Sequence, residues 1–76
     1  MGLTDAIRQA FKTAPNVQMG ATGVRSRLKQ IGFDITVYGN LLASIHTVLG
    51  RLEKSGEIKH VSNSTEGKMY VSVKKD

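Results

Sequence analysis

Residues 40–58 read NLLASIHTVLGRLEKSGEI and carry the clearest secondary-structure signal in the chain. Asn40 is a favourable N-cap residue, and Gly56 suits the left-handed backbone at which many helices end. At about 100° per residue, six apolar side chains gather on one side of a helix over residues 40–55. They are Leu41, Leu42, Ile45, Val48, Leu49 and Leu52. The stretch therefore predicts an amphipathic helix with one buried face, followed at once by a strand that starts at Glu57.

The opposite side of this predicted helix carries short and polar side chains. It collects Asn40, Ala43, Ser44, Thr47, Gly50, Arg51 and Lys54. A glycine inside a helix lowers the stability by about 0.5–1 kcal/mol relative to alanine, so the presence of Gly50 needs an explanation. Close approach to a ligand is one such reason, and a tight contact with a neighbouring element is another. Short polar side chains flanked by cations favour a surface that fits a nucleic-acid groove.

Two short strands are expected after this helix. Residues 57–61 and 69–73 alternate apolar and polar side chains, as half-buried strands do. The polar residues 62–68, SNSTEGK, are rich in turn-forming types and predict a hairpin with a longer loop. We expect residues 74–76 to form a solvated tail.

A first helix is expected near the amino terminus. Thr4 is its predicted cap, and the helix should end before Pro15, because the residue that precedes a proline is pushed out of the helical region. Residues 17–19 then alternate apolar and polar types and predict a very short strand. The apolar face of this helix comprises Leu3, Ile7, Ala10, Phe11 and Ala14.

A second helix is predicted over residues 22–31, with Thr22 as its cap. The connection at residues 32–39 begins with a glycine suited to a left-handed stop, and Phe33 and Tyr38 are expected to tuck into the core. This connection is longer than the tight turn of a minimal helix-turn-helix. The predicted buried face of the helix comprises Val24, Leu28 and Ile31.

The predicted order of elements, together with the run LGRLEKSGEI at residues 49–58, resembles the winged helix-turn-helix DNA-binding domain family. That resemblance implies an α+β fold, a winged helix of three helices, a short first strand and a two-stranded β-hairpin wing. It also implies that the third helix, about residues 40–55, enters the major groove of DNA. The hairpin loop at residues 62–68 is then the wing.

The same resemblance implies roles for individual side chains. Asn40, Ser44 and Thr47 would face base edges or phosphates. Arg51 and Lys54 would meet phosphate further along the helix. Lys68 would lie on the wing, with Asn63 or Ser64 beside it.

A second cationic group is expected on the second helix, where Arg25, Ser26 and Lys29 share a face. The two cations lie one helical turn apart and could hold phosphate, which sets register without reading sequence. The plainer interpretations are a solvated face here, Asn40 as a cap alone, and Lys54 paired with an adjacent acid. The complete predicted nucleic-acid-binding set is Arg25, Ser26, Lys29, Asn40, Ser44, Thr47, Arg51, Lys54, Lys59 and Lys68.

The charge balance supports a polyanionic partner. Eleven Lys and Arg residues against six Asp and Glu residues leave a net charge of +5. We expect a single domain over residues 1–76 that binds double-stranded DNA, as part of a transcriptional or other DNA-associated regulator. Because one small domain offers limited interface, a homodimer or a partner protein would add affinity. The expected location is the cytoplasm, and the nucleoid if the source is bacterial.

The residue inventory argues against catalysis. The chain has no cysteine, and its two histidines, His46 and His60, lack the spacing of a metal site. The glycines of residues 20–25 lack the Gly-Lys-Ser/Thr ending of a phosphate loop. We therefore expect no enzyme activity, cofactor, metal or small-molecule substrate. Without a signal-like amino terminus or a bilayer-length apolar run, we also expect no export and no membrane partner.

One competing function stays open at this point. Winged helices also serve as protein-protein interaction or dimerisation modules, so fold alone does not settle function. The long connection at residues 32–39 favours that alternative, because Ile35, Val37 and Tyr38 could form an exposed apolar patch. The polar face of the third helix favours DNA instead.

Overall fold

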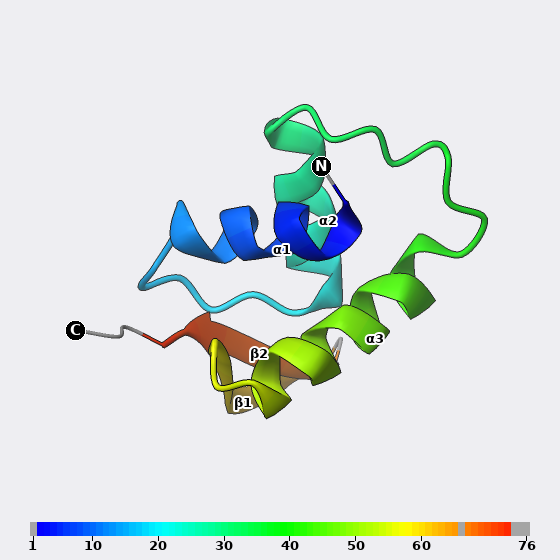
Figure 1. The fold of residues 1–76 in the computed structure, drawn as a ribbon. Helices are drawn as coiled ribbons and strands as arrows, with labels where there is room; N and C mark the ends of the chain where they lie inside the picture. Colours follow the sequence, from blue (N-terminus) through cyan, green and yellow to red (C-terminus); the bar gives the residue numbers. More distant parts are fainter. Residues whose placement is uncertain (1, 66, 74–76) are drawn as a thin grey trace.

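The computed structural model describes residues 2–65 and 67–73 and shows three helices followed by an antiparallel hairpin (Figure 1). This is the predicted α+β arrangement. The elements are α1 (Leu3–Lys12), α2 (Ala21–Gln30), α3 (Leu41–Lys54), β1 (Ile58–Ser64) and β2 (Gly67–Ser72).

The N-cap of the first helix lies two residues earlier than predicted. Gly2 is the N-cap of α1 and caps it with no side chain, whereas Thr4 lies inside the helix. The prediction of Thr4 as the cap was wrong because Leu3 joins the helix and packs against the core. The helix ends at Lys12, where the Thr13 hydroxyl donates a 3.0 Å hydrogen bond back to a helix carbonyl.

The second helix also begins earlier, at Ala21, with Gly20 as its N-cap and Thr22 inside it. Gly32 has a φ of +81° and confirms the predicted left-handed stop. Ile31 was predicted to be buried but is 41% exposed. It is the C-cap residue, so the backbone has already left the helical path that would carry its side chain to the core.

The third helix matches the prediction closely. The Asn40 side-chain oxygen accepts a 3.2 Å hydrogen bond from the Ala43 amide, and Gly56 has a φ of +84°. Leu42 was predicted to lie on the buried face, but its side chain is 37% exposed. The buried residues of α3 are Leu41, Ile45, Val48, Leu49 and Leu52.

The hairpin is longer, and its turn shorter, than the alternation predicted. The register runs from Ile58 opposite Ser72 to Ser64 opposite Gly67, so most of the predicted loop is paired strand. The polar, turn-forming residue types of that segment predicted a loop. The strands pair through backbone hydrogen bonds, which do not depend on those side chains. A bulge falls between His60 and Ser62. Glu66 and the predicted tail at residues 74–76 lie outside the described residues.

The predicted strand at residues 17–19 is reduced to a single bridge. Met19 exchanges two backbone hydrogen bonds with Tyr70, of 2.8 and 2.9 Å. Val17 instead donates to the Ala14 carbonyl at 3.2 Å in a turn that follows α1, and its side chain is exposed. The bridge nevertheless fastens this segment to the outer edge of β2.

One core joins the three helices and the hairpin. Its fully buried side chains include Phe11 from α1, Leu28 from α2 and Leu49 from α3, and the hairpin adds Ile58 and Tyr70. The α2–α3 connection closes the core from another side. Its residues Phe33, Ile35 and Tyr38 are partly buried against the core, as expected for the two aromatic residues.

Candidate nucleic-acid interface

The outward face of α3 exposes Thr47, Arg51 and Lys54, as the helical spacing predicts. Ser44 is only half-exposed, and its hydroxyl donates to the Asn40 carbonyl at 3.3 Å. The Thr47 hydroxyl likewise donates to the carbonyl of residue 43 at 3.1 Å. Because these protons point at the helix backbone, both hydroxyls offer only acceptor lone pairs outward.

Gly50 lies on the same face in open space. A Cβ atom built at this position would meet nothing within 4 Å among the described residues. Of the two reasons considered for an interior glycine here, tight contact with a neighbouring element is therefore excluded within the described fold.

The second helix exposes Arg25, Ser26 and Lys29. The sequence of α2 contains no acidic residue, so the field along this helix is uniformly positive. Arg27 is turned toward its own helix, where it donates a 3.2 Å hydrogen bond to the Gln30 side chain. The predicted cations of α2 thus face solvent rather than an internal partner.

The hairpin exposes Lys59 and Lys68 at opposite ends of its length. Lys59 lies near the base, opposite Val71, whereas Lys68 lies near the turn, opposite Asn63. The Asn63 side-chain oxygen lies 2.9 Å from Nε2 of His60, so this amide is engaged within the hairpin. Lys68 is therefore the wing cation that projects furthest along the hairpin.

The hairpin is held against the start of α2 by three features of residues 18–20. The Ser62 hydroxyl donates a 2.8 Å hydrogen bond to the Gln18 side chain, beside the Met19 bridge. A Cβ atom at Gly20 would lie 3.1 Å from the Lys68 carbonyl oxygen and 3.1 Å from a methionine sulfur. The glycine thus lets the backbone next to Lys68 approach the N-terminus of α2.

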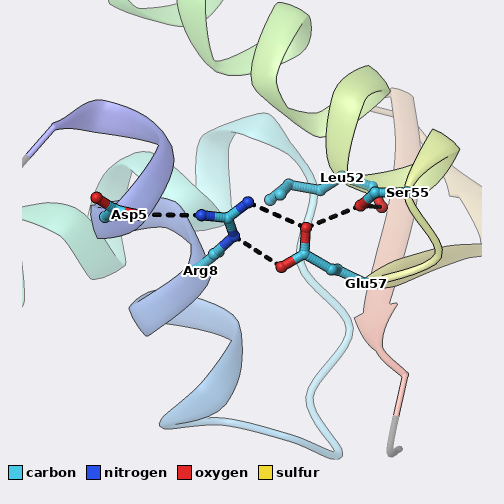
Figure 2. Close-up of polar contacts among 5 residues, drawn as sticks. All are labelled: Asp5, Arg8, Leu52, Ser55 and Glu57. Carbon is cyan, nitrogen blue, oxygen red and sulfur yellow. Dashed lines mark hydrogen bonds and ion pairs between the residues drawn. The ribbon is translucent and has the colours of Figure 1, made fainter.

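The acids of the described fold are mostly occupied elsewhere. Asp5 and Glu57 both bind Arg8 (Figure 2), and Asp34 accepts hydrogen bonds from Thr36 in the α2–α3 connection. Burial, with a smaller contribution from the charge of Glu53, raises the pKa of Tyr70. Within residues 2–65 and 67–73, no ion pair involves any of the six predicted phosphate-binding cations, which are Arg25, Lys29, Arg51, Lys54, Lys59 and Lys68.

The ten predicted residues come from three elements that pack against one another. Helix α2 packs on α3, and the hairpin contacts both helices (Figure 1). Ser44 is the least accessible of the ten, and the other nine are exposed.

Sequence reasoning passed over His46, which it considered only as a metal ligand. His46 is exposed on α3, one turn after Leu42 and one turn before Gly50. Leu42, His46 and Gly50 share one side of the helix at about 100° per residue. The sequence analysis assigned Leu42 to the buried face and left His46 out of the outward face.

Two further properties of the described residues bear on ligands. The described part of the chain holds no group of three or more His, Asp or Glu side chains arranged to bind a metal ion. Nor does any helix there have both the length and the apolar character that a membrane span requires.

Three helices followed by a two-stranded antiparallel hairpin, in this order, form a winged-helix fold. A solved structure with a similar fold is that of the ferric uptake regulator from Francisella tularensis with iron. It superposes with a TM-score of 0.69 at 25% sequence identity, over 91% of this chain and 48% of that chain. This chain therefore spans about half the length of that regulator. No protein-family model and no curated protein matches the sequence.

Proposed function

We propose that this chain is a DNA-binding module of a regulator, which places α3 in the major groove and the hairpin against the neighbouring backbone. The observation that carries this proposal is the set of exposed cations on α2, α3 and the hairpin, free of ion pairs within the described fold. Unpaired cations are the groups that bind phosphate and release its counterions. The fold similarity to a regulator supports the same function.

Each element has a distinct role in the proposal. Arg25, Ser26 and Lys29 on α2 hold the backbone on one side of the groove. Thr47 on α3 meets the groove itself, with Asn40 and Ser44 toward the start of the helix. The remaining cations, Arg51, Lys54, Lys59 and Lys68, meet phosphate along α3 and the wing.

The competing function, a protein-protein module, loses most of its sequence support. Of the three residues expected to form an apolar patch, Ile35 and Tyr38 pack partly against the core, and Tyr38 stacks on Phe33 with ring centroids 6.0 Å apart. Val37 alone is fully outward, at 72% exposure. A single exposed valine is ordinary for a protein surface.

The test is fluorescence anisotropy of a labelled mixed-sequence duplex at several salt concentrations. If the six cations all meet phosphate, log K against log salt should have a slope of roughly −5. Arg51→Ala should weaken binding and make the slope shallower by about one unit. Thr47→Glu should abolish binding, because it puts a carboxylate where the groove would lie.

Lys12→Ala is the matched control. Lys12 is an exposed cation of α1, outside the proposed surface, so its loss removes the same charge without removing a proposed contact. Equal weakening by Lys12→Ala and Arg51→Ala would mean that net charge alone drives binding. Absence of binding even at low salt would refute DNA binding by this domain and make a protein partner at the α2–α3 connection the leading account.

The domain's role in a larger assembly is also a proposal. A chain half as long as the similar regulator offers limited interface, and useful affinity then requires two copies or a linked partner domain. Sedimentation of the chain with and without duplex would show whether two copies bind one site.

A further inference from the structure

We infer that His46 is a base-reading residue of α3 and that it selects guanine in the major groove. This inference rests on the proposed function and adds to it the kind of sequence that the module prefers. Two observations support it: the hydrogen bonds that already engage the polar side chains of α3, and the open space around Gly50.

The polar side chains first predicted to read bases are largely engaged by the helix itself. The Asn40 oxygen caps the Ala43 amide, and the Ser44 and Thr47 hydroxyl protons are donated to backbone carbonyls. Neither hydroxyl keeps a donor for a ligand, and the Asn40 oxygen is shared with the Ala43 amide. The two hydroxyls therefore keep only acceptor lone pairs, which suit an amino group on a base edge and not a phosphate oxygen.

His46 differs from them in this respect. It is exposed on the same helix, and neither ring nitrogen has a hydrogen-bond partner among the described residues. An imidazole carries at least one N–H donor in either protonation state. His46 therefore has an uncommitted donor for a base edge in the second turn of α3, and the side-chain nitrogen of Asn40 offers another at the N-cap.

The surroundings of His46 allow a base to reach it. Gly50, one turn further along, has no side chain and nothing near its missing Cβ atom. The helix backbone can therefore come close to the floor of a groove at this point, and the imidazole one turn earlier is carried inward with it. Leu42, one turn before His46, and Ala43 add an exposed apolar rim.

The chemistry of the base edges favours guanine. Guanine presents two acceptors, N7 and O6, and no donor in the major groove, so it accepts an N–H from the neutral and the protonated imidazole alike. Adenine and cytosine each present an amino donor there, which opposes an imidazolium. The apolar rim of Leu42 and Ala43 suits the methyl group of thymine. The preferred site should thus contain guanine next to thymine.

The experiment is selection from a randomised duplex library with the wild-type chain and with His46→Ala, followed by titration of the selected duplex. The wild type should select guanine at one position, and His46→Ala should lose that preference. Replacing this guanine by 7-deazaguanine, which lacks the N7 acceptor, should weaken the wild type about tenfold and His46→Ala less than about twofold. A merely structural role for His46 would not produce this dependence on one base atom.

His46→Gln gives a second readout. A glutamine pairs with the N6 and N7 atoms of adenine, so this variant should shift the selected base from guanine to adenine. Identical preferences for the wild type and both variants, or equal losses on 7-deazaguanine, would overturn the inference while DNA binding stands. A wild type that binds no duplex would overturn the proposed function and this inference together. Circular dichroism of each variant establishes that α3 is intact.

Discussion

The Arg8 guanidinium on α1 binds both carboxylate oxygens of Glu57, forty-nine positions along the chain, with distances of 2.7 and 3.2 Å (Figure 2). The same carboxylate accepts a 2.8 Å hydrogen bond from Ser55, the C-cap of α3. Because Glu57 stands between α3 and β1, this pair ties α1 to the point where the third helix passes into the wing.

We expect Glu57→Gln to lower the melting temperature, because it removes the charge that Arg8 binds in two places. Both side chains are partly exposed, so the loss should be modest and should shrink as salt is added. Asp5→Asn is the control, since Asp5 also binds Arg8 but is 63% exposed and lies on the same helix. Thermal unfolding at low and high salt measures both. An equal loss for the two variants would contradict a special role for the link between α1 and Glu57.

Gly20→Ala should destabilise the fold by about 1–3 kcal/mol, because its Cβ atom would press on the Lys68 carbonyl and force the hairpin away from α2. Gly23→Ala, three residues further on, is the matched control. Gly23 lies inside α2, and its Cβ atom would make an ordinary 3.5 Å contact with Met19, so this variant should gain about 0.5–1 kcal/mol of stability. Urea denaturation compares them. Similar stabilities for the two variants would show that the approach at Gly20 is not tight.

Gly50→Ala should separate stability from binding. In open space inside a helix, the alanine should stabilise the fold by about 0.5–1 kcal/mol. The same methyl group should weaken duplex binding if α3 approaches DNA at this residue. Urea denaturation and anisotropy on one preparation give both numbers. Undiminished affinity in a stabilised variant would place the DNA-facing surface elsewhere.

Leu49→Ala should cost about 2–5 kcal/mol, because Leu49 is almost completely buried at the centre of the core. Leu42→Ala makes the identical chemical change on the same helix at a position that is 37% exposed. It should cost about 0.5 kcal/mol. Chemical denaturation of the two variants tests the orientation of α3, and a larger loss at Leu42 would mean that the helix is rotated.

Hydrogen bonds from the Thr36 side chain and then its amide hold the pKa of Asp34 below the ordinary value of 3.8. A carboxylate with a lowered folded pKa stabilises the fold above its unfolded pKa, and this contribution disappears as the pH falls through the folded pKa. Thr36→Val should therefore lower the melting temperature at neutral pH and have little effect in strong acid. It should also raise the Asp34 pKa, measured by NMR titration of the side-chain carboxyl. An unchanged titration would show that the hydroxyl does not bind the carboxylate.

The features predicted from sequence with most success are those decided within one turn of the chain. The Asn40 cap and the left-handed glycines at 32 and 56 depend on neighbours three or four residues away. The order of helices and hairpin followed from the same local patterns, and with it the winged-helix class. The exposure of the cations on α2 and α3 followed from helical spacing.

What the sequence could not decide were the relations between distant segments. Residues 62–64 form a strand because they pair with the other strand of the hairpin. Their polar composition does not predict that pairing. The exposure of Ile31 depended on where the backbone left the helix. The apolar patch expected around Val37 does not form as predicted, because Ile35 and Tyr38 pack partly against the core.

The sequence by itself determined three helices, a hairpin, the caps that delimit α3 and the positive charge of the surface, because periodicity, capping and charge are properties of nearby residues. Only the tertiary structure decided how residues at the edges of the helix faces, such as Ile31 and Leu42, are exposed. It also decided that Gly20 allows the hairpin to approach α2 and that Arg8 binds Glu57. These depend on contacts between segments far apart in the chain, whose geometry is set when the core packs.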